Sequence, residues 1–266
     1  MNNLLTMFNY DFMVRAAVAG VAIAVSAGLI GLPLVLRRNA MIGDGLSHVG
    51  FAVFAVAAVL GIAPLQFAIP IVILTSFLMF KFSERARIGG DAIIALVSAS
   101  ALAVGVLVVS LGGVNMDINS YLFGSILAVS EADMIASLIA TVVVIVFFVL
   151  CYHQIFAMSF DAKFASSVGV KTKYYELVFA VLCSVVIVLG MKIAGALLVS
   201  SLLVFPCVTA RYAARSFREV TIMSAILAVV GFVIGLVLSY VLSVPTGATI
   251  VLTNLVMLII FRFLKN

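Results

Sequence analysis

Long apolar runs, separated by short stretches that contain charges, Pro or Gly, dominate this chain of 266 residues. A helix that crosses a bilayer uses about 20 predominantly apolar residues, and each run is close to that length. We therefore predict nine membrane-spanning helices, at residues 14–36, 40–61, 64–82, 91–111, 133–151, 175–191, 193–213, 220–242 and 246–264. Because residues 175–213 can be divided in more than one way, eight spans are the alternative.

Composition narrows the class of protein. Hydrophobic residues make up 66% of the chain and charged residues only 9%, against about 25% charged residues in ordinary soluble domains. The mean hydropathy of +1.39 excludes a water-soluble globule and leaves little chain for a separate aqueous domain. We expect an all-α fold, a polytopic transmembrane helical bundle in which residues 1–266 form a single domain.

The charges indicate how the bundle is oriented. A net charge of +5 would suit a nucleic-acid partner, but membrane proteins collect Lys and Arg on their cytoplasmic side. If the amino terminus lies outside, 13 of the 15 basic residues are cytoplasmic and only Arg15 and Lys192 face outward. We therefore predict an outer amino terminus, a cytoplasmic carboxyl terminus, a lipid bilayer as the surroundings and no nucleic-acid partner.

Two stretches between spans are long enough to have a role of their own. The outer one, residues 112–132, has no Lys or Arg and ends in a semi-apolar run that could lie in the interface or dip back into the membrane. The inner one, residues 152–174, is the largest polar cytoplasmic segment. Residues 160–168 predict about two helical turns that end at Gly169, a normal helix stop. This short helix suits either docking to a partner or a simple connection.

The strongest candidate for chemistry is the run MIGDGLSH at residues 41–48. Asp44 and His48 are four positions apart, which places a carboxylate and an imidazole on one helix face. An ionisable group inside a membrane is costly unless it is paired or faces water, so it marks a functional candidate. Oxygen and nitrogen ligands of this kind suit Zn²⁺ or Mn²⁺. Two ligands are an incomplete set, which suits a transport site and could be completed by a second copy of the chain. In the alternative, the two side chains satisfy each other and fix a helix contact.

Other features carry less chemical information. Cys151, Cys183 and Cys207 are widely spaced in apolar runs and are interpreted as core residues, and His153 is interpreted as a solvated loop residue. The chain has no G-x-x-x-x-G-K-[ST] loop, so we expect no ATP hydrolysis by this chain itself. Neither H-E-x-x-H nor G-x-S-x-G occurs, which argues against an intramembrane protease or lipase.

Five segments in order along the chain resemble the membrane subunit of bacterial ATP-binding-cassette importers for zinc, manganese or iron. They are LRRNAMIGDGLSHVGFA, MDINSYLFGSILAVSEAD, SFDAKFASSVGV, AGALLVSSLLVFPCVTAR and VPTGATIVL, and together they cover nearly the whole chain. The resemblance implies the ABC importer permease fold in a bacterial cytoplasmic membrane. It also implies a permease that works as a pair, with a cytoplasmic ATPase subunit that uses ATP and an extracytoplasmic metal-binding protein as partners.

The resemblance also assigns residues. The D-x-x-[SA]-H pattern of the family falls on Asp44, Ser47 and His48, and implies that Asp44 and His48 contact the transported metal. A D-x-x-x-A-x-x-x-G segment falls on Asp161, Ala165 and Gly169, and resembles the helix that seats on the ATPase. NYDFMVRA and YLFGSIL look more like zinc permeases than manganese permeases, so zinc is favoured as cargo over manganese.

Two other functions remain open from the sequence. One is a secondary metal transporter or channel that needs no ATPase. The other is a membrane enzyme that uses Asp44 and His48 as an acid and base pair, although few other polar residues accompany them.

Overall fold

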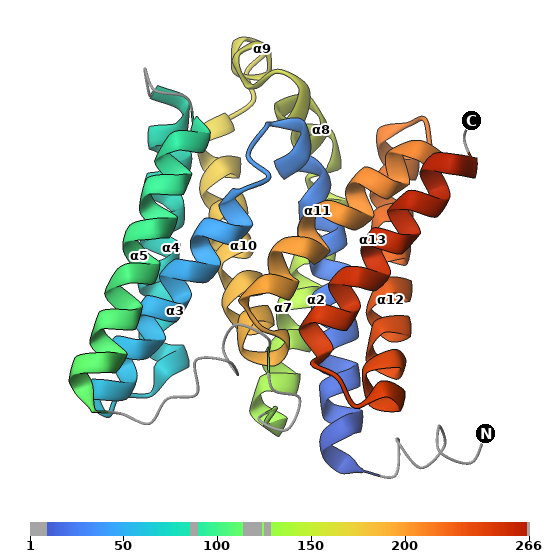
Figure 1. The fold of residues 1–266 in the computed structure, drawn as a ribbon. Helices are drawn as coiled ribbons and strands as arrows, with labels where there is room; N and C mark the ends of the chain where they lie inside the picture. Colours follow the sequence, from blue (N-terminus) through green and yellow to red (C-terminus); the bar gives the residue numbers. More distant parts are fainter. Residues whose placement is uncertain (1–9, 86–89, 114–123, 125–128, 265–266) are drawn as a thin grey trace.

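The computed structural model describes residues 10–85, 90–113, 124 and 129–264, and every regular element within these residues is a helix (Figure 1). Nine of the described helices are long and apolar enough to cross a membrane. They are α2 (Asp11–Leu36), α3 (Ile42–Leu60), α4 (Pro64–Arg85), α5 (Gly90–Gly112), α7 (Glu131–Leu150), α10 (Thr172–Ala194), α11 (Ala196–Ala213), α12 (Phe217–Leu242) and α13 (Thr246–Leu264). Two short helices, α8 (Tyr152–Phe160) and α9 (Ala162–Ser167), lie between α7 and α10.

The predicted all-α bundle and its nine spans are confirmed. The stretch at residues 175–213, which left eight spans as an alternative, divides into α10 and α11 at Gly195. Gly195 has φ 86° and ψ 159°, a conformation that glycine adopts without the steric penalty of a side chain. Pro33, Pro70 and Pro206 lie inside continuous helices, so none of them breaks a span.

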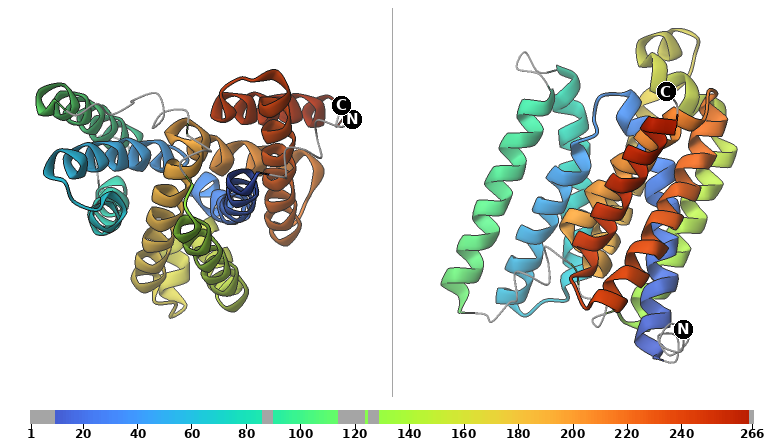
Figure 2. Two further views of the ribbon diagram at one scale, coloured as in Figure 1. Left: turned by 90° about the horizontal axis from the view of Figure 1, so that it is seen from below. Right: turned by 45° about the vertical axis from the view of Figure 1, so that its right-hand side comes forward.

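Helix α2 occupies the middle of the bundle, where it packs against α7, α10, α11 and α12 (Figure 2). Small residues permit these close contacts. A Cβ atom added at Gly31 would lie 2.0 Å from the carbonyl oxygen of Leu203 in α11, and one added at Gly28 would lie 2.7 Å from the Cα of Ala225 in α12. Without a hydrophobic driving force between helices in lipid, such close backbone packing supplies much of the attraction.

Buried serine and threonine hydroxyl groups in the bundle are bonded to the backbone or to each other. The Ser26 hydroxyl donates to Thr141 Oγ1 at 2.9 Å, and Thr141 in turn donates to the carbonyl oxygen of Ala22 at 2.8 Å. Ser224 donates to the carbonyl oxygen of Gly28 at 2.8 Å. These bonds join α2 to α7 and α12, and they meet the requirement that polar groups in a membrane find partners within the protein.

The peripheral helices α4 and α5 expose apolar side chains, as a lipid-facing surface requires. On α5, Leu96, Leu107 and Leu111 are 59% exposed or more. The start of α2 and the end of α13 lie at opposite ends of the bundle, with α9 at the same end as the end of α13 (Figure 1). This arrangement is the one that an odd number of spans produces.

Candidate functional site

Asp44 and His48 lie in the first two turns of α3 and face the same side of it. Figure 1 shows that the chain descends from the end of α2 before α3 begins, so α3 starts below the upper ends of α4 and α5. Asp44 is in the first turn, where the positive end of the helix dipole favours a carboxylate. The Asp44 side chain is 43% exposed and the His48 side chain 19% exposed.

Small residues on the other sides of α3 let neighbouring helices pack closely against them, whereas the face with Asp44 and His48 stays partly open. A Cβ atom at Gly43 would lie 2.6 Å from Leu203 of α11, and one at Gly45 would lie 2.8 Å from Met79 of α4. Ser47 is fully buried, and its hydroxyl donates to the carbonyl oxygen of Gly43 at 2.8 Å. Ser47 therefore shapes the helix, whereas the side chains of Asp44 and His48 remain partly exposed.

The two polar side chains approach each other without a hydrogen bond. His48 Nε2 lies 3.7 Å from Asp44 Oδ2, beyond hydrogen-bond range. His48 Nδ1 is buried and has no hydrogen-bond partner among the described residues. The two side chains thus lie within ion-pair distance of each other, and their hydrogen-bonding capacity is only partly used among the described residues.

Among the described residues, one chain brings only Asp44 and His48 together at this place as candidate metal ligands. No group of three or more His, Cys, Asp or Glu side chains that could hold a metal occurs in the described residues. A closed structural zinc site needs four protein ligands, so a pair of this kind suits an ion that passes. Ser200 of α11 packs near Gly43 on the covered side of α3, with its Cα 3.7 Å from a Cβ built on that glycine.

The inner segment contains the expected short helix, but its start differs from the prediction. Helix α8 ends at Phe160, and α9 begins at Ala162 instead of continuing from residue 160. The break lies at Asp161, whose carboxylate accepts hydrogen bonds from the backbone N–H groups of Lys163 and Phe164, both at 2.9 Å. An aspartate in this role is a strong N-cap, which starts a new helix.

Ala165 and Gly169 have equally clear structural roles. Ala165 is fully buried, and the backbone N–H of Val170 donates to its carbonyl oxygen at 3.0 Å. Gly169 has φ 91°, so it ends the helix in the left-handed region that favours glycine. The predicted stop at Gly169 is confirmed.

Large apolar side chains are exposed on α8 and around α9, beside polar ones such as Asp161 and Lys163. Phe160, Phe164 and Val168 are each 64% exposed or more, at the end of the bundle where α9 projects (Figure 1). Asp161, Ala165 and Gly169 therefore build the shape of α9, whereas Phe160, Phe164 and Val168 form exposed apolar surface around it. The sequence motif identified the first set and missed the second, because exposure depends on how α9 packs on α8 and α10.

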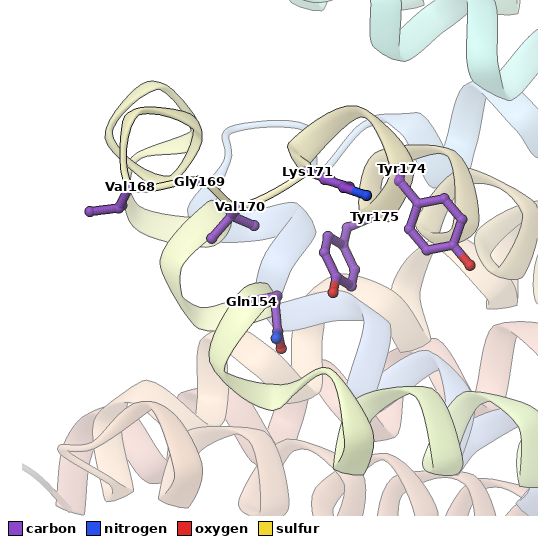
Figure 3. Close-up of a pocket in the computed structure, with 7 residues that line it drawn as sticks. All are labelled: Gln154, Val168, Gly169, Val170, Lys171, Tyr174 and Tyr175. Carbon is purple, nitrogen blue, oxygen red and sulfur yellow. The ribbon is translucent and has the colours of Figure 1, made fainter.

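A polar cavity of about 540 Å³ lies beside α9. Figure 3 shows Gln154 of α8 facing the stretch from Val168 to Tyr175, with Tyr175 turned toward the cavity and Val168 pointing away from it. Gln154 Oε1 is buried and has no hydrogen-bond partner among the described residues. The cavity keeps α9 apart from the start of α10, so α9 is attached to the bundle over only part of its surface.

Comparison with known proteins shows to which family this architecture belongs. A model of the ABC 3 transport family matches residues 9–265. The chain belongs to the ABC 3 transport family. This ABC 3 protein is similar to the manganese import system permease protein ScaB of Streptococcus parasanguinis, with 31% identity over 96% of this chain and 91% of the relative. It is also similar to the manganese transport system membrane protein MntC of Listeria monocytogenes, with 27% identity over 97% of this chain and 92% of the relative.

A solved structure agrees with the fold. The structure of PsaBC from Streptococcus pneumoniae in complex with Fab has a TM-score of 0.86 to the ABC 3 protein at 26% identity, and covers 98% of this chain and 94% of that one. The ABC 3 protein is thus a multi-pass membrane protein and the permease subunit of an ABC metal importer.

Two ion pairs in the ABC 3 permease were not predicted. Lys192 Nζ lies 2.7 Å from Asp133 Oδ1 and joins α10 to α7, and Arg37 Nη2 lies 2.6 Å from Glu176 Oε1 and joins the end of α2 to α10. The partners are 59 and 139 residues apart along the chain, so no local sequence pattern predicts these ion pairs.

The remaining sequence predictions had mixed outcomes. Cys183 and Cys207 are buried and Cys151 is partly buried, all three as free thiols, which confirms a core role for the first two. His153 is exposed, as expected, but it lies on helix α8 and not in a loop. Most of the outer stretch 112–132 lies outside the described residues, so its predicted interfacial run is not assessed.

Proposed function

We propose that this permease imports a divalent metal ion and that Asp44 and His48 contact the ion on its way. The observation that carries the proposal is the open pair itself. His48 Nε2 and Asp44 Oδ2 lie 3.7 Å apart on a partly exposed face of a buried helix, with capacity for further ligands. Two donors bind an ion loosely enough to release it, and a second copy of the chain would add two more.

The cargo that we propose is Mn²⁺. Imidazole and carboxylate ligands fit Mn²⁺ and Zn²⁺ alike, so the donor set does not discriminate between them. The sequence favoured zinc on the basis of two short segments. The relatives ScaB and MntC match this chain over nearly their whole length, and both are named as manganese proteins. The names of full-length relatives outweigh the short segments, and Zn²⁺ is the second candidate.

Transport requires partners in this proposal. A cytoplasmic ATPase subunit docks on α9 and the exposed side chains of Phe160, Phe164 and Val168, and it hydrolyses ATP. A second copy of the permease completes the pathway, and an extracytoplasmic binding protein delivers the ion. The capped start and glycine stop give α9 a fixed shape that can transmit motion to α8 and α10.

Metal uptake by cells that depend on this importer tests the site. His48→Ala should reduce Mn²⁺ uptake by at least tenfold, because removal of one of two ligands leaves a single donor for the ion. His153→Ala replaces the only other histidine, which is exposed on α8, and should leave uptake unchanged. Normal uptake by cells with His48→Ala at a normal protein level would contradict the assignment of Asp44 and His48 to the ion pathway.

The rival functions make different predictions in the same system. A secondary transporter or channel would carry Mn²⁺ into liposomes that contain the permease without its ATPase, and our proposal predicts no uptake there. A membrane enzyme would leave metal uptake intact in the His48→Ala variant.

A further inference from the structure

A groove runs along the outside of the bundle between α7 and α12. Helix α2 contacts both of these helices and forms the floor between them (Figure 2). Two cavities, of about 530 and 440 Å³, lie along this groove, one toward the inner end and one toward the outer end. Ile145 on α7 and Ile226 and Val230 on α12 are also exposed, at positions along their helices between the residues that line the two cavities.

The inner cavity is polar at one end and apolar at the other. Tyr152 and Arg218 line it where α7 ends and α12 begins, and Leu29, Phe148 and Ile222 line it further into the bundle. Arg218 is exposed, and no ion pair holds its guanidinium among the described residues. A cation and a tyrosine at the membrane interface are the groups that meet lipid headgroups.

The outer cavity has an almost entirely apolar lining. Val18 and Val21 of α2, Leu138 and Val142 of α7, and Val233 of α12 are among its walls. A protein segment in this place would bring polar side chains or, if it were not helical, an unsatisfied backbone, and the apolar lining supplies partners for neither. An acyl chain needs none.

We propose that this groove holds a phospholipid of the inner leaflet with an anionic headgroup. The phosphate pairs with Arg218 and accepts from the hydroxyl of Tyr152. One acyl chain lies over Leu29, Phe148 and Ile222 and extends toward the outer cavity. The groove is arranged like a lipid molecule. Its charged end, with Arg218, lies at the inner surface, where a headgroup lies, and its apolar part runs along the helices, as an acyl chain does.

Lipid retention measured by native mass spectrometry of the purified permease complex tests this proposal. After exchange into phosphatidylglycerol, the natural protein should retain bound lipid through detergent washing, and phosphatidylcholine with the same chains should be retained less. Arg218→Gln should weaken phosphatidylglycerol retention about fivefold, the effect of about 1 kcal/mol for one basic residue at an anionic surface. Lys173→Gln removes an exposed positive charge from the start of α10, outside the groove, and should change nothing.

A second variant fills the groove without changing its charge. Val149 is 70% exposed on α7 and lines the inner cavity, so Val149→Trp should block the acyl chain and lower retention of both lipids. Equal retention by the natural protein, Arg218→Gln and Val149→Trp would overturn the proposal. Conversion of the complex from two permease copies to one by Val149→Trp would also overturn it, because the groove would then be a contact between copies.

Discussion

At the scale of single residues, a short sequence run was enough to find Asp44 and His48. Their spacing of four positions places them on one helix face whatever the rest of the fold does. Their exposure could not be predicted, because it depends on Gly43 and Gly45 allowing α11 and α4 to cover the other sides of α3. The open face is therefore a property of three helices, α3, α4 and α11, although the pair itself belongs to one.

The ion pair between Lys192 and Asp133 gives an asymmetric prediction. The Asp133 side chain is 4% exposed and that of Lys192 is 35% exposed. Lys192→Met leaves a buried carboxylate without its counter-charge, which should cost about 3 kcal/mol. Asp133→Asn leaves an ammonium group that can reach water, so the loss of stability should be smaller.

Thermal unfolding of the purified permease in detergent measures this difference. Lys192→Met should lower the midpoint temperature more than Asp133→Asn does, and Lys173→Met at the other end of α10 should leave it unchanged. An equal or reversed order for the first two variants would mean that the pair is not the source of the stability.

At the scale of elements, the nine spans were predictable because length and hydropathy are local properties of the sequence. The break between α8 and α9 was not predicted, since residues 160–168 read as one helical stretch. The Asp161 side chain competes for the backbone N–H groups of Lys163 and Phe164 and thereby starts α9 afresh. A capping interaction of this kind overrides helix propensity at a single residue.

The cap predicts a specific pattern of rescue. Asp161→Ala removes both hydrogen bonds and should weaken the start of α9 by about 1 kcal/mol, so that ATP-driven metal uptake falls severalfold. Asp161→Ser keeps a capping oxygen and should restore most of the uptake. Uptake is measured in cells, with the amount of assembled complex as the control. Equal loss in both variants would indicate that the charge of Asp161, and not its cap, is needed.

At the scale of the whole molecule, the position of α2 between α7, α10, α11 and α12 could not be read from the sequence. Every span is apolar on most of its surface, so hydropathy does not say which face meets another helix and which meets lipid. The small residues Gly28 and Gly31 mark two close contacts, but only the structure identifies their partners as α12 and α11. The groove between α7 and α12 is invisible in the sequence for the same reason.

The orientation of the bundle remains a prediction that labelling can test. Single cysteines at Arg38 and Lys163 should react with a membrane-impermeant thiol reagent only after the cells are opened, whereas a cysteine at Asp11 should react in intact cells. These positions lie at opposite ends of α2 and on α9. The three native cysteines are replaced first, so that each signal comes from one site. Labelling of position 163 in intact cells would show that the orientation is the reverse of the predicted one.

The central claim is that an ion held by Asp44 and His48 is moved by ATP hydrolysis on a partner subunit. The most direct measurement is the ATPase rate and metal uptake of the complete complex in liposomes, with its binding protein and with Mn²⁺ and Zn²⁺ in parallel. We predict that Mn²⁺ raises both the rate and the uptake, and that His48→Ala abolishes the metal-dependent part of each while His153→Ala keeps it. Metal-stimulated hydrolysis and uptake that persist in His48→Ala would contradict the account.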